Sequence, residues 1–256
     1  MEALTTMAYR QLKRFARARS RVAGMIINPL LWLVFFGMGW SKVFDNPMVR
    51  TIFGGVDYLT FLAPGIFAMT VFNQSFVAGV SVIWDKQFGF LKEVLVAPAS
   101  RKESILGRII GDSLVTLTQG AIILALTFFL AENLKPSGFL PALGVGFLLA
   151  MAFSGFGVSL ALRMESMEGF QMIMMVLMLP LTFLSGAIYP IETMPGWMKA
   201  LAYVNPLTYA VDGARHFLVG ASVAKFSLAV DLGVLAVLAA ILVGLAMVEF
   251  ERATIG

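Results

Sequence analysis

Six apolar blocks, each about 20 residues long, dominate the sequence and limit what it can fold into. A helix of about 20 residues rises about 30 Å, which matches the thickness of the hydrocarbon core of a bilayer. The sequence therefore predicts an all-α integral membrane protein with six transmembrane helices in a single domain, residues 22–256. The expected spans are approximately 22–40, 58–83, 105–130, 139–162, 170–189 and 228–248.

Charged and titratable side chains interrupt the region between the fifth and sixth blocks, so we do not expect a seventh span there. A charge at the centre of a span costs about 2.5–3.5 kcal/mol. We expect this region to form short re-entrant helices on the outer side of the membrane. The interrupting residues are Glu192, Lys199, Asp212, Arg215 and His216.

The composition excludes several classes of functional site. Charged residues make up 13% of the chain, which is about half their share in an average soluble domain. The sequence has no cysteine, so disulfides, thiolate metal sites and cysteine nucleophiles are excluded. A single histidine, His216, leaves little material for a metal site or for histidine-based catalysis, and we predict neither. The predicted spans contain no cluster of carboxylates, so the sequence does not suggest an intramembrane enzyme.

The distribution of Lys and Arg predicts the orientation in the membrane. Twelve of the 19 basic residues precede the first block, follow the second or fourth, or lie in the tail, against six on the other side. By the positive-inside rule, both termini are expected in the cytoplasm, in a multi-pass protein of the plasma membrane. We expect the first block to be a retained span and not a cleaved signal peptide, because no small-residue cleavage site follows it.

Residues 1–21 are predicted to hold an amphipathic cytoplasmic interface helix. Leu4, Ala8, Leu12 and Phe15 fall on one helical stripe, and the basic residues lie mostly elsewhere. Two interpretations stay open and are compatible. The helix can anchor on the lipid surface with snorkelling arginines, or it can also contact a cytoplasmic partner.

The loop between the second and third blocks has a pattern of its own, FLKEVLVAPASRKES at 90–104. Its apolar residues Phe90, Leu91, Val94 and Leu95 share one face of a short helix. Pro98 prevents that helix from continuing. The Ser100–Glu103 spacing fits a capping box, which predicts a new helix running into the third span. The alternative is an ordinary connector on the lipid surface.

This loop resembles the coupling segment in permeases of the type-2 ABC exporter superfamily, which includes the daunorubicin-resistance and nodulation-factor exporters. The family pattern is close to D-R-E-x-G-x-L-x-E-x-L-x-x-P-x-S-R. Asp85 matches its first position and Ser100 and Arg101 match its last two, with Lys86 and Gln87 as departures. The resemblance implies a cytoplasmic coupling helix that docks an ATPase. The coupling residues that it implies are Gly89, Phe90, Leu91, Glu93, Leu95, Pro98 and Arg101.

A second block, residues 183–215, is similar to the family's F-L-S-G, proline turn and N-P-L-T-Y. Thr193 with Pro195, and Asn205 with Pro206, can each start a short helix. The resemblance implies an extracellular gate, and the alternative is a static interfacial lid. The gate residues are Ser185, Gly186, Pro190, Pro195, Asn205, Pro206, Tyr209 and Arg215.

Several polar residues lie within the predicted spans. They can line a pathway or form interhelical hydrogen bonds worth about 0.6 kcal/mol each. Arg108 and Asp112 are expected to pair on one helix face, and Asp231 is expected to pair with Arg215. The candidate pathway residues are Asn28, Asn73, Gln74, Ser75 and Gln119.

No G-x-x-x-x-G-K-[ST] motif occurs in the sequence, so no P-loop ATPase activity is expected of this chain. The resemblance implies the permease subunit of an ABC transporter, a homodimer that binds two copies of a separate P-loop ATPase. The chain would bind no cofactor, and ATP and Mg would lie on the ATPase. No nucleic-acid partner is expected.

The expected activity is export, by alternating access, of a hydrophobic or amphipathic compound such as a drug or lipid, including multidrug efflux. The alternative with the same architecture is an exporter of a glycan or a lipid-linked saccharide. An ion-coupled secondary transporter is disfavoured, because the charged residues lie toward the ends of the spans and not at the midplane.

Overall fold

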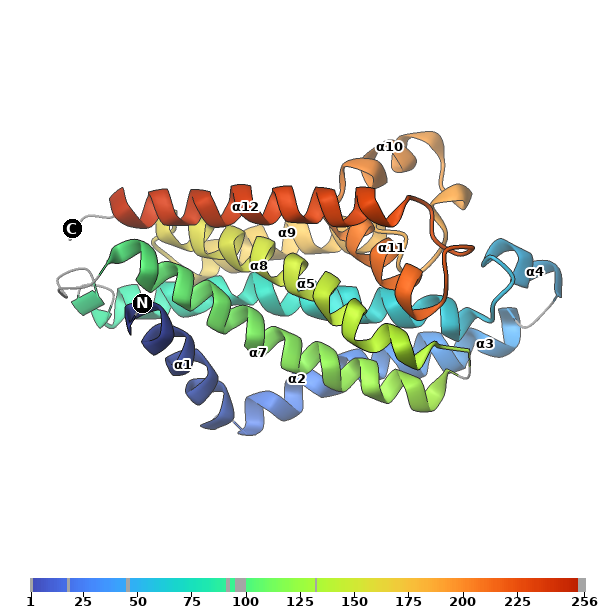
Figure 1. Ribbon diagram of the computed structural model, residues 1–256, viewed down its shortest axis with the longest axis horizontal. Coiled ribbons are helices and arrows are strands. Elements are labelled where there is room, and N and C mark those ends of the chain that lie inside the picture. The colour runs from blue at the N-terminus through green and yellow to red at the C-terminus, as the bar shows by residue number, and fades with distance from the viewer. Residues whose placement is uncertain are drawn as a thin grey trace.

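The computed structural model describes residues 2–17, 19–44, 47–90, 93–94, 100–131 and 133–252. The regular structure of these residues is helical, and they contain no strand. The longer helices run approximately along the longest axis of the molecule and form a bundle (Figure 1). The expected all-α architecture is confirmed.

Four helices among the described residues are long and apolar enough to cross a membrane. They correspond to the second, third, fourth and sixth apolar blocks. Their bounds are α5 Tyr58–Gln87, α7 Arg101–Leu130, α8 Phe139–Arg163 (preceded by the 3-10 turn η2, Pro136–Gly138) and α12 Leu228–Arg252.

The other two blocks form shorter helices. The fifth block gives α9, Met167–Phe183, which has 17 residues and therefore rises only about 26 Å. The first block begins with α2, Arg19–Trp32, passes through the π-helical segment η1, Leu33–Met38, and ends in α3, Gly39–Phe44. The six-span layout therefore stays a prediction for these two blocks.

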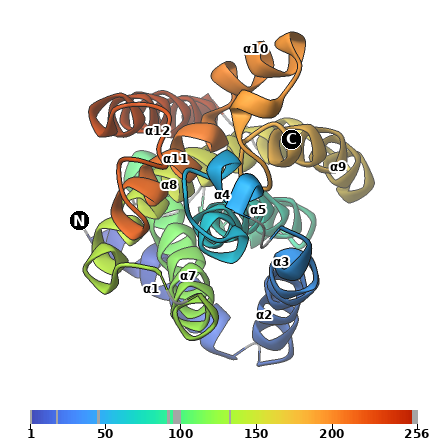
Figure 2. The ribbon, with the colours of Figure 1, turned by 90° about the vertical axis from the view of Figure 1, so that its right-hand side faces the viewer.

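Helix α5 lies at the centre of the bundle. Viewed end-on, α7, α8 and α11 lie on one side of α5, and α2, α3 and α9 lie on the other (Figure 2). Most of α5 is buried, and its phenylalanines pack against α8 and α9. The ring of Phe72 lies 4.6 Å from that of Phe153, and the ring of Phe76 lies 6.1 Å from that of Phe170.

The two ends of the bundle differ. The start of α1 and the end of α12 lie at one end, which we call the inner end (Figure 1). There Arg163 pairs with Glu249, and Lys102 lies 3.3 Å from Glu251. The short helices lie at the other, outer end. They are α4 Pro47–Ile52, η3 Ile191–Thr193, α10 Gly196–Val204 and α11 Pro206–Leu218.

The N-terminal helix α1 spans Glu2–Arg17, and α2 begins at Arg19. Leu4 and Ala8 of its predicted apolar stripe pack on α7, where two glycines let the backbones approach, whereas Leu12 of the stripe is 37% exposed. A Cβ on Gly111 would lie 2.9 Å from the Cα of Ala8, and a Cβ on Gly107 would overlap the backbone oxygen of Leu4. Gln11 is buried in the same contact. Helix α1 is therefore packed as part of the bundle.

Candidate functional site

Asp85 organises the inner end of the bundle. It lies near the end of α5 and is 5% exposed. Arg108 of α7 donates to its Oδ2 at 2.7 Å, and Arg10 of α1 donates to its Oδ1 at 3.1 Å. Arg108 also donates to the hydroxyl of Ser81 at 2.7 Å. One carboxylate therefore joins α1, α5 and α7.

The start of the predicted coupling segment is attached to this cluster. Gly89 has a φ of +80°, a conformation that glycine adopts without strain. The chain thereby turns out of α5, and the guanidinium of Arg10 lies 3.8 Å from the ring centroid of Phe90. The backbone N–H of Glu93 donates to the Gly89 carbonyl at 3.4 Å, which begins a helical turn.

The rest of the predicted coupling helix is only partly described. Leu91, Leu95 and Pro98 lie outside the described residues. Ser100 caps α7 by accepting a hydrogen bond from the N–H of Glu103, which confirms the predicted helix start. Arg101, the first residue of α7, donates to the carbonyl of Glu251 at 3.1 Å.

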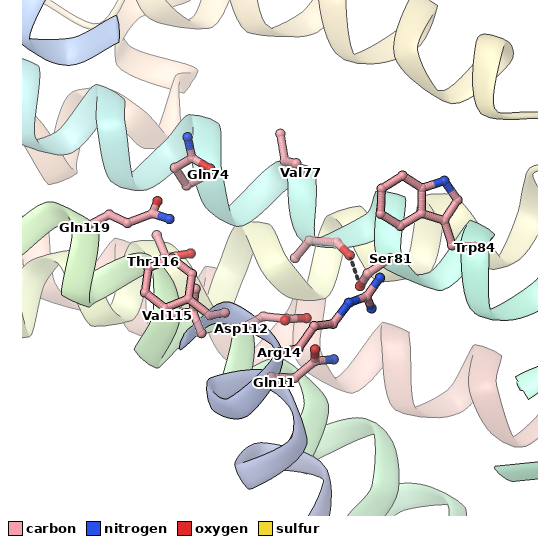
Figure 3. A pocket seen from close by; sticks show the side chains of 12 residues that line it. Gln11, Arg14, Gln74, Val77, Ser81, Trp84, Asp112, Val115, Thr116 and Gln119 are labelled. Carbon is pink, nitrogen blue, oxygen red and sulfur yellow. Dashed lines mark hydrogen bonds between the residues drawn. The ribbon is translucent and has the colours of Figure 1, made fainter. Parts of the chain in front are cut away.

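The expected Arg108–Asp112 pair is present but secondary. Nε of Arg108 lies 4.0 Å from Asp112, whereas its Nη1 lies 2.7 Å from Asp85. Asp112 instead faces a polar pocket of about 320 Å³ between α1, α5 and α7 (Figure 3). The lining residues are Gln11, Arg14, Phe15, Gln74, Val77, Ala78, Ser81, Trp84, Asp112, Val115, Thr116 and Gln119.

A larger cavity of about 820 Å³ lies on the opposite side of α5, between α2 and α9. It contains three of the five predicted pathway residues, Asn28, Asn73 and Gln74. Most of the other lining residues are apolar, and four of them are methionines. The lining residues are Gly24, Asn28, Pro29, Trp32, Ile66, Met69, Thr70, Asn73, Gln74, Gln171, Met174, Met175, Met178, Leu179, Thr182 and Phe183.

The other two predicted pathway residues do not reach this cavity. Ser75 is fully buried, and its hydroxyl donates to the Phe72 carbonyl at 3.0 Å. Gln119 is 1% exposed and lines the polar pocket. Gln74 borders both the polar pocket and the larger cavity. The Ser75 hydroxyl therefore bonds within α5 and not to another helix, unlike the interhelical hydrogen bond that was the expected alternative.

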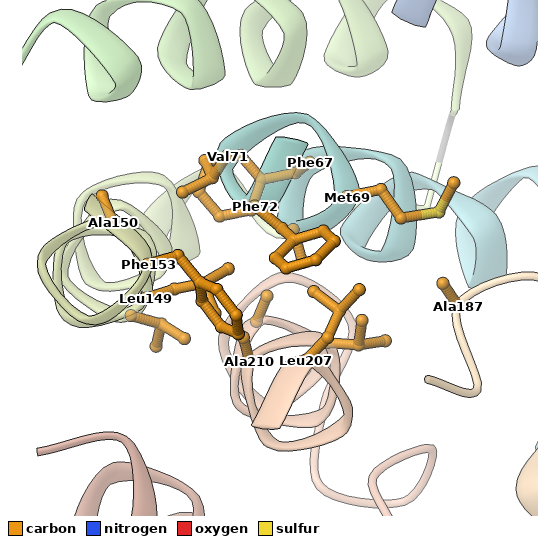
Figure 4. Close-up of a cluster of buried hydrophobic side chains, with 14 of the residues drawn as sticks. Phe67, Met69, Val71, Phe72, Leu149, Ala150, Phe153, Ala187, Leu207 and Ala210 are labelled. Atoms are coloured by element: carbon orange, nitrogen blue, oxygen red, sulfur yellow. The ribbon is translucent and has the colours of Figure 1, made fainter. Parts of the chain in front are cut away.

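Behind the side of α5 that lines the cavity, buried side chains of three helices pack together. Figure 4 shows Phe72 among side chains of α5, α8 and α11, with Phe153 and Leu207 close to it. Met69 points away from this cluster, toward the cavity that it lines. Methionine side chains are flexible and polarizable, so they adapt to apolar guests of different shape. The cavity therefore combines a wall backed by the packed Phe72 cluster with a lining of flexible methionine side chains.

The helices on both sides of the cavity expose large apolar side chains. On α9, Met175 is 76% exposed and Leu179 is 62% exposed. On the first block, Ile27 is 54% exposed and Phe35 is 65% exposed. This face is therefore built to be covered by lipid or by another apolar protein surface.

At the outer end, Arg215 holds the turn that follows α9. Arg215 is 4% exposed and donates to the carbonyls of Gly186 at 2.6 Å and Ala187 at 3.4 Å. Its guanidinium also lies 3.8 Å from the ring centroid of Phe61 in α5. Gly186 has a φ of +71°, and Ser185 stabilises the turn by accepting from the N–H of Ala187.

The same network fastens α10 and α11. Asn205 caps α11 by accepting from the N–H of Leu207 at 3.0 Å, and it donates to the carbonyl of Leu181 at 2.6 Å. Pro206 occupies the first turn of α11, and the Tyr209 hydroxyl donates to the carbonyl of Tyr203 at 2.6 Å. The predicted helix start at Asn205 and Pro206 is confirmed. Thr193 instead ends η3, and α10 begins at Gly196 without a side-chain cap. Pro195 precedes α10, and Pro190 precedes η3.

Electrostatics at the outer end follow from burial and pairing. Burial lowers the pKa of Arg215 to about 10, while nearby Asp212 and Glu192 act in the opposite direction. Glu192 lies 2.6 Å from Lys225. Although partial burial opposes the change, this contact lowers the pKa of Glu192, and it raises the pKa of Lys225. Both side chains therefore stay charged near neutral pH.

The expected pairing of Asp231 with Arg215 is wrong. Arg215 points to the carbonyls of the α9–η3 turn, and the carboxylate of Asp231 lies 3.7 Å from His216. Both Arg215 and His216 belong to α11, but neighbouring positions on a helix face different directions. The sequence separation gave no means to choose between them.

Three residues with structural roles were not among the predicted site residues: Asp85 and Arg10 at the inner end and Phe61 at the outer end. Asp85 was recognised only as a match to the family pattern, not as a site residue. Arg10 is one of the basic residues that lie off the apolar stripe of the N-terminal helix, which by itself indicates no buried partner. Phe61, which supports Arg215, carries no polar signal within an apolar block. A buried aspartate at the end of a span is the signal that would have identified the first of them.

Comparison with known proteins gives a consistent result. Residues 2–219 match the family model described as ABC-2 type transporter. The chain is 34% identical to the transport permease ycf38 of Cyanophora paradoxa, over 80% of this chain and 69% of that protein. It is 26% identical to the daunorubicin resistance ABC transporter permease protein DrrB1 of Streptomyces coeruleorubidus, over 86% and 76%. It is 25% identical to the inner membrane transport permease YadH of Escherichia coli K12, over 85% and 83%.

Proposed function

The chain belongs to the ABC-2 type transporter family, whose members are multi-pass membrane subunits of ABC transporters and not enzymes themselves. From this premise, we propose that it forms the transmembrane path of an ATP-driven exporter. Its cargo would be a hydrophobic or amphipathic compound, and its energy would come from a separate ATPase subunit.

The cavity between α2, α5 and α9 carries this proposal. A volume of about 820 Å³ suits a drug-sized guest, since ligand pockets typically hold about 300–1,000 Å³. The apolar lining favours a guest with a large apolar body. The amides of Asn28, Asn73 and Gln74 offer a few hydrogen bonds for polar groups on that guest. The name of the Streptomyces relative, a daunorubicin resistance permease, agrees with such a cargo.

A second copy of this chain is the proposed cover of the cavity. Among the described residues of α9, only Phe170, Met174 and Thr182 are buried. The exposed apolar side chains of α9 and of the first block flank the cavity on both sides. Packing two such faces about a two-fold axis would bury them and enclose one shared path. The transporter would then contain two copies of this chain and two ATPase subunits.

The inner end would transmit movement of the ATPase to the membrane helices. In the proposed orientation this end faces the cytoplasm, and the ATPase binds at Phe88–Ala97. Displacement of Phe90 would act on Arg10, and through Asp85 on α5 and α7. Because the Arg108–Asp85 pair is buried and charged, α5 and α7 would move together, and the partly exposed side chain of Arg10 would connect α1 to them. A rigid-body change between inward-open and outward-open states follows from such a connection.

The outer network would then act as the gate. Arg215 links α11 to the turn after α9 and to Phe61 of α5. A tilt of α5 would therefore be transmitted to the short helices at the outer end. The gate would open when this linked unit moves away from its counterpart in the second copy.

The test uses the chain reconstituted in liposomes with its ATPase subunit. Met178→Trp, which fills the cavity, should reduce the stimulation of ATP hydrolysis by hydrophobic compounds severalfold. Ile241→Trp on α12, where the native side chain is 60% exposed, is the matched control and should leave the stimulation unchanged. Equal stimulation in the two variants would remove the cavity from the transport path.

The coupling assignment has its own test. Replacement of residues 90–97 by a Gly-Ser sequence of the same length should abolish co-purification of the ATPase, while the chain still inserts into the membrane. Undiminished co-purification would place the docking surface elsewhere.

A further inference from the structure

Three ligand-type side chains meet at the junction of α11 and α12, outside the cavity and the inner cluster. Asp212 and His216 are four residues apart in α11 and therefore share one face. Asp231 lies in the first turn of α12, and the two helices are adjacent in both ribbon views (Figures 1 and 2). One potential ligand atom from each residue lies within 4.8 Å of the others.

The buried carboxylate of Asp231 shows that this junction is incomplete by itself. Asp231 is 0% exposed, and neither of its oxygens accepts a hydrogen bond from a described residue. A buried carboxylate without donors is costly, because it has lost its water and gained no replacement. Nε2 of His216 lies 3.7 Å from Oδ2 of Asp231.

The neighbouring positive groups are directed elsewhere. The ammonium of Lys225 pairs with Glu192, and the guanidinium of Arg215 donates to Gly186 and Ala187. Asp212 does have donors, the backbone N–H groups of Lys225 and Phe226 at 2.7–2.9 Å. Those bonds fix the position of its carboxylate but supply no full positive charge. Asp231 is therefore left without a cation.

From this arrangement we propose that Asp212, His216 and Asp231 bind one divalent metal cation of the zinc class. Imidazole nitrogen and carboxylate oxygen are ligands that zinc accepts in proteins. Bonds of about 2.0 Å in a tetrahedral site hold the ligand atoms roughly 3.3 Å apart. The His216 and Asp231 atoms are 3.7 Å apart, which is close to that spacing, and the three ligand atoms lie within 4.8 Å of one another. Rotation of the His216 and Asp231 side chains toward the fixed carboxylate of Asp212 would complete the site.

In the metal-free state, one hydrogen bond shows which ring nitrogen of His216 carries the hydrogen. Nε2 of His216 lies 2.8 Å from the carbonyl oxygen of Phe226, so this nitrogen carries the hydrogen and donates it. A metal bound at Nε2 requires the ring hydrogen to lie on Nδ1, so the hydrogen moves from Nε2 to Nδ1 by exchange with solvent, and the imidazole stays neutral with no net proton released from His216. The Phe226 oxygen then lies beside the metal as a further oxygen donor.

The site has an approach and a consequence. Asp212 also lines a cavity of about 430 Å³ at the outer end, together with Glu192 and Lys225. A cation can therefore reach the junction from the outer end. Once bound, it would cross-link α11 to α12. The inference does not depend on transport, since it concerns binding and stability of the chain alone.

The experiment titrates zinc into the purified full-length chain in detergent, after dialysis against a chelator. Calorimetry should show one zinc bound per chain. Asp231→Asn and His216→Gln should each weaken zinc binding about tenfold or more. Glu192→Gln, at the adjacent ion pair, is the matched control and should bind zinc like the wild type.

His216→Cys guards against a trivial loss of structure, because it replaces one zinc ligand by another in a chain with no native cysteine. It should restore zinc binding that His216→Gln loses, and both variants should elute from size exclusion like the wild type. The proposal is overturned if the folded wild type binds no zinc. It is also overturned if Asp231→Asn and His216→Gln leave the affinity unchanged, or if Asp231→Asn alone raises the thermal midpoint in chelator while zinc has no effect.

Discussion

Replacement of Asp85 by alanine should destabilise the protein more than any other single change at the inner end. The carboxylate is almost fully buried and accepts from two guanidinium groups on different helices. Its removal leaves Arg108, whose side chain is 3% exposed, without its charged partner at 2.7 Å. Breaking a buried ion pair from one side typically costs about 3–5 kcal/mol.

The two arginines provide an internal comparison. The Arg10 side chain is 30% exposed and contacts Asp85 at 3.1 Å. Pairs that reach water contribute little, so Arg10→Ala should cost about 1 kcal/mol or less. The double variant Asp85→Ala with Arg108→Ala removes both buried charges and should cost less than the sum of its single variants.

Reversible unfolding in mixed detergent micelles, followed by tryptophan fluorescence, measures these free energies of unfolding. Additive effects for Asp85 and Arg108 would refute the reasoning, because they would show that the two side chains are not coupled. A cost for Arg10→Ala as large as that for Asp85→Ala would contradict the ranking by burial.

Two further predictions concern the edges of the bundle. Gly111→Leu should push α1 away from α7 at a cost of about 1–3 kcal/mol, and a cysteine placed at buried Gln11 should then react faster with a thiol reagent. Gly244→Leu, at a position with open space around it, is the control and should change neither the stability nor the cysteine reactivity. Equal cysteine reactivity in the Gly111→Leu and Gly244→Leu backgrounds would contradict the packing of α1. The Glu192–Lys225 pair should stabilise the outer end by at most about 1 kcal/mol, so the thermal midpoints of wild type and Glu192→Gln should differ at neutral pH. The Glu192 pKa is lowered, so the difference should decline as pH falls below the usual glutamate value of 4.5 and vanish only below the lowered pKa. The Lys225 pKa is raised, so the difference should also vanish as pH rises well above the usual lysine value of 10.5. A difference that persists at both extremes would contradict the prediction.

Local signals in the sequence predicted local structure well. The capping residues Ser100 and Asn205 start helices where expected, because a side chain that accepts from a nearby N–H acts within a few residues. Length and hydropathy identified α5, α7, α8 and α12 as candidate spans. The family resemblance also follows from short linear patterns, and the comparisons confirm it.

Long-range pairings could not be predicted in the same way. Asp85 contacts residues 23 and 75 positions away, and Arg215 contacts the turn 29 positions before it. These partners are chosen by how the helices cross, and helix crossing is not encoded in spacing along one helix. The grouping of Asp212, His216 and Asp231 at the junction of α11 and α12 could not be predicted for the same reason. A single histidine in the sequence does not indicate which carboxylates lie beside it in the fold.

The pathway residues illustrate both results. A run of three polar residues, Asn73, Gln74 and Ser75, predicted a pathway or polar contacts midway along α5. Successive residues on a helix point about 100° apart, so they cannot all face one cavity. Only the structure shows that Asn73 and Gln74 line it and that Ser75 turns into the core.

The central claim is that this chain supplies the path and a separate ATPase supplies the energy. The most direct measurement is uptake of a fluorescent hydrophobic compound into inside-out proteoliposomes that contain the purified chain, with and without the ATPase subunit. Accumulation against a gradient should require the chain, the ATPase and ATP together. Uphill accumulation by the chain alone would contradict the account.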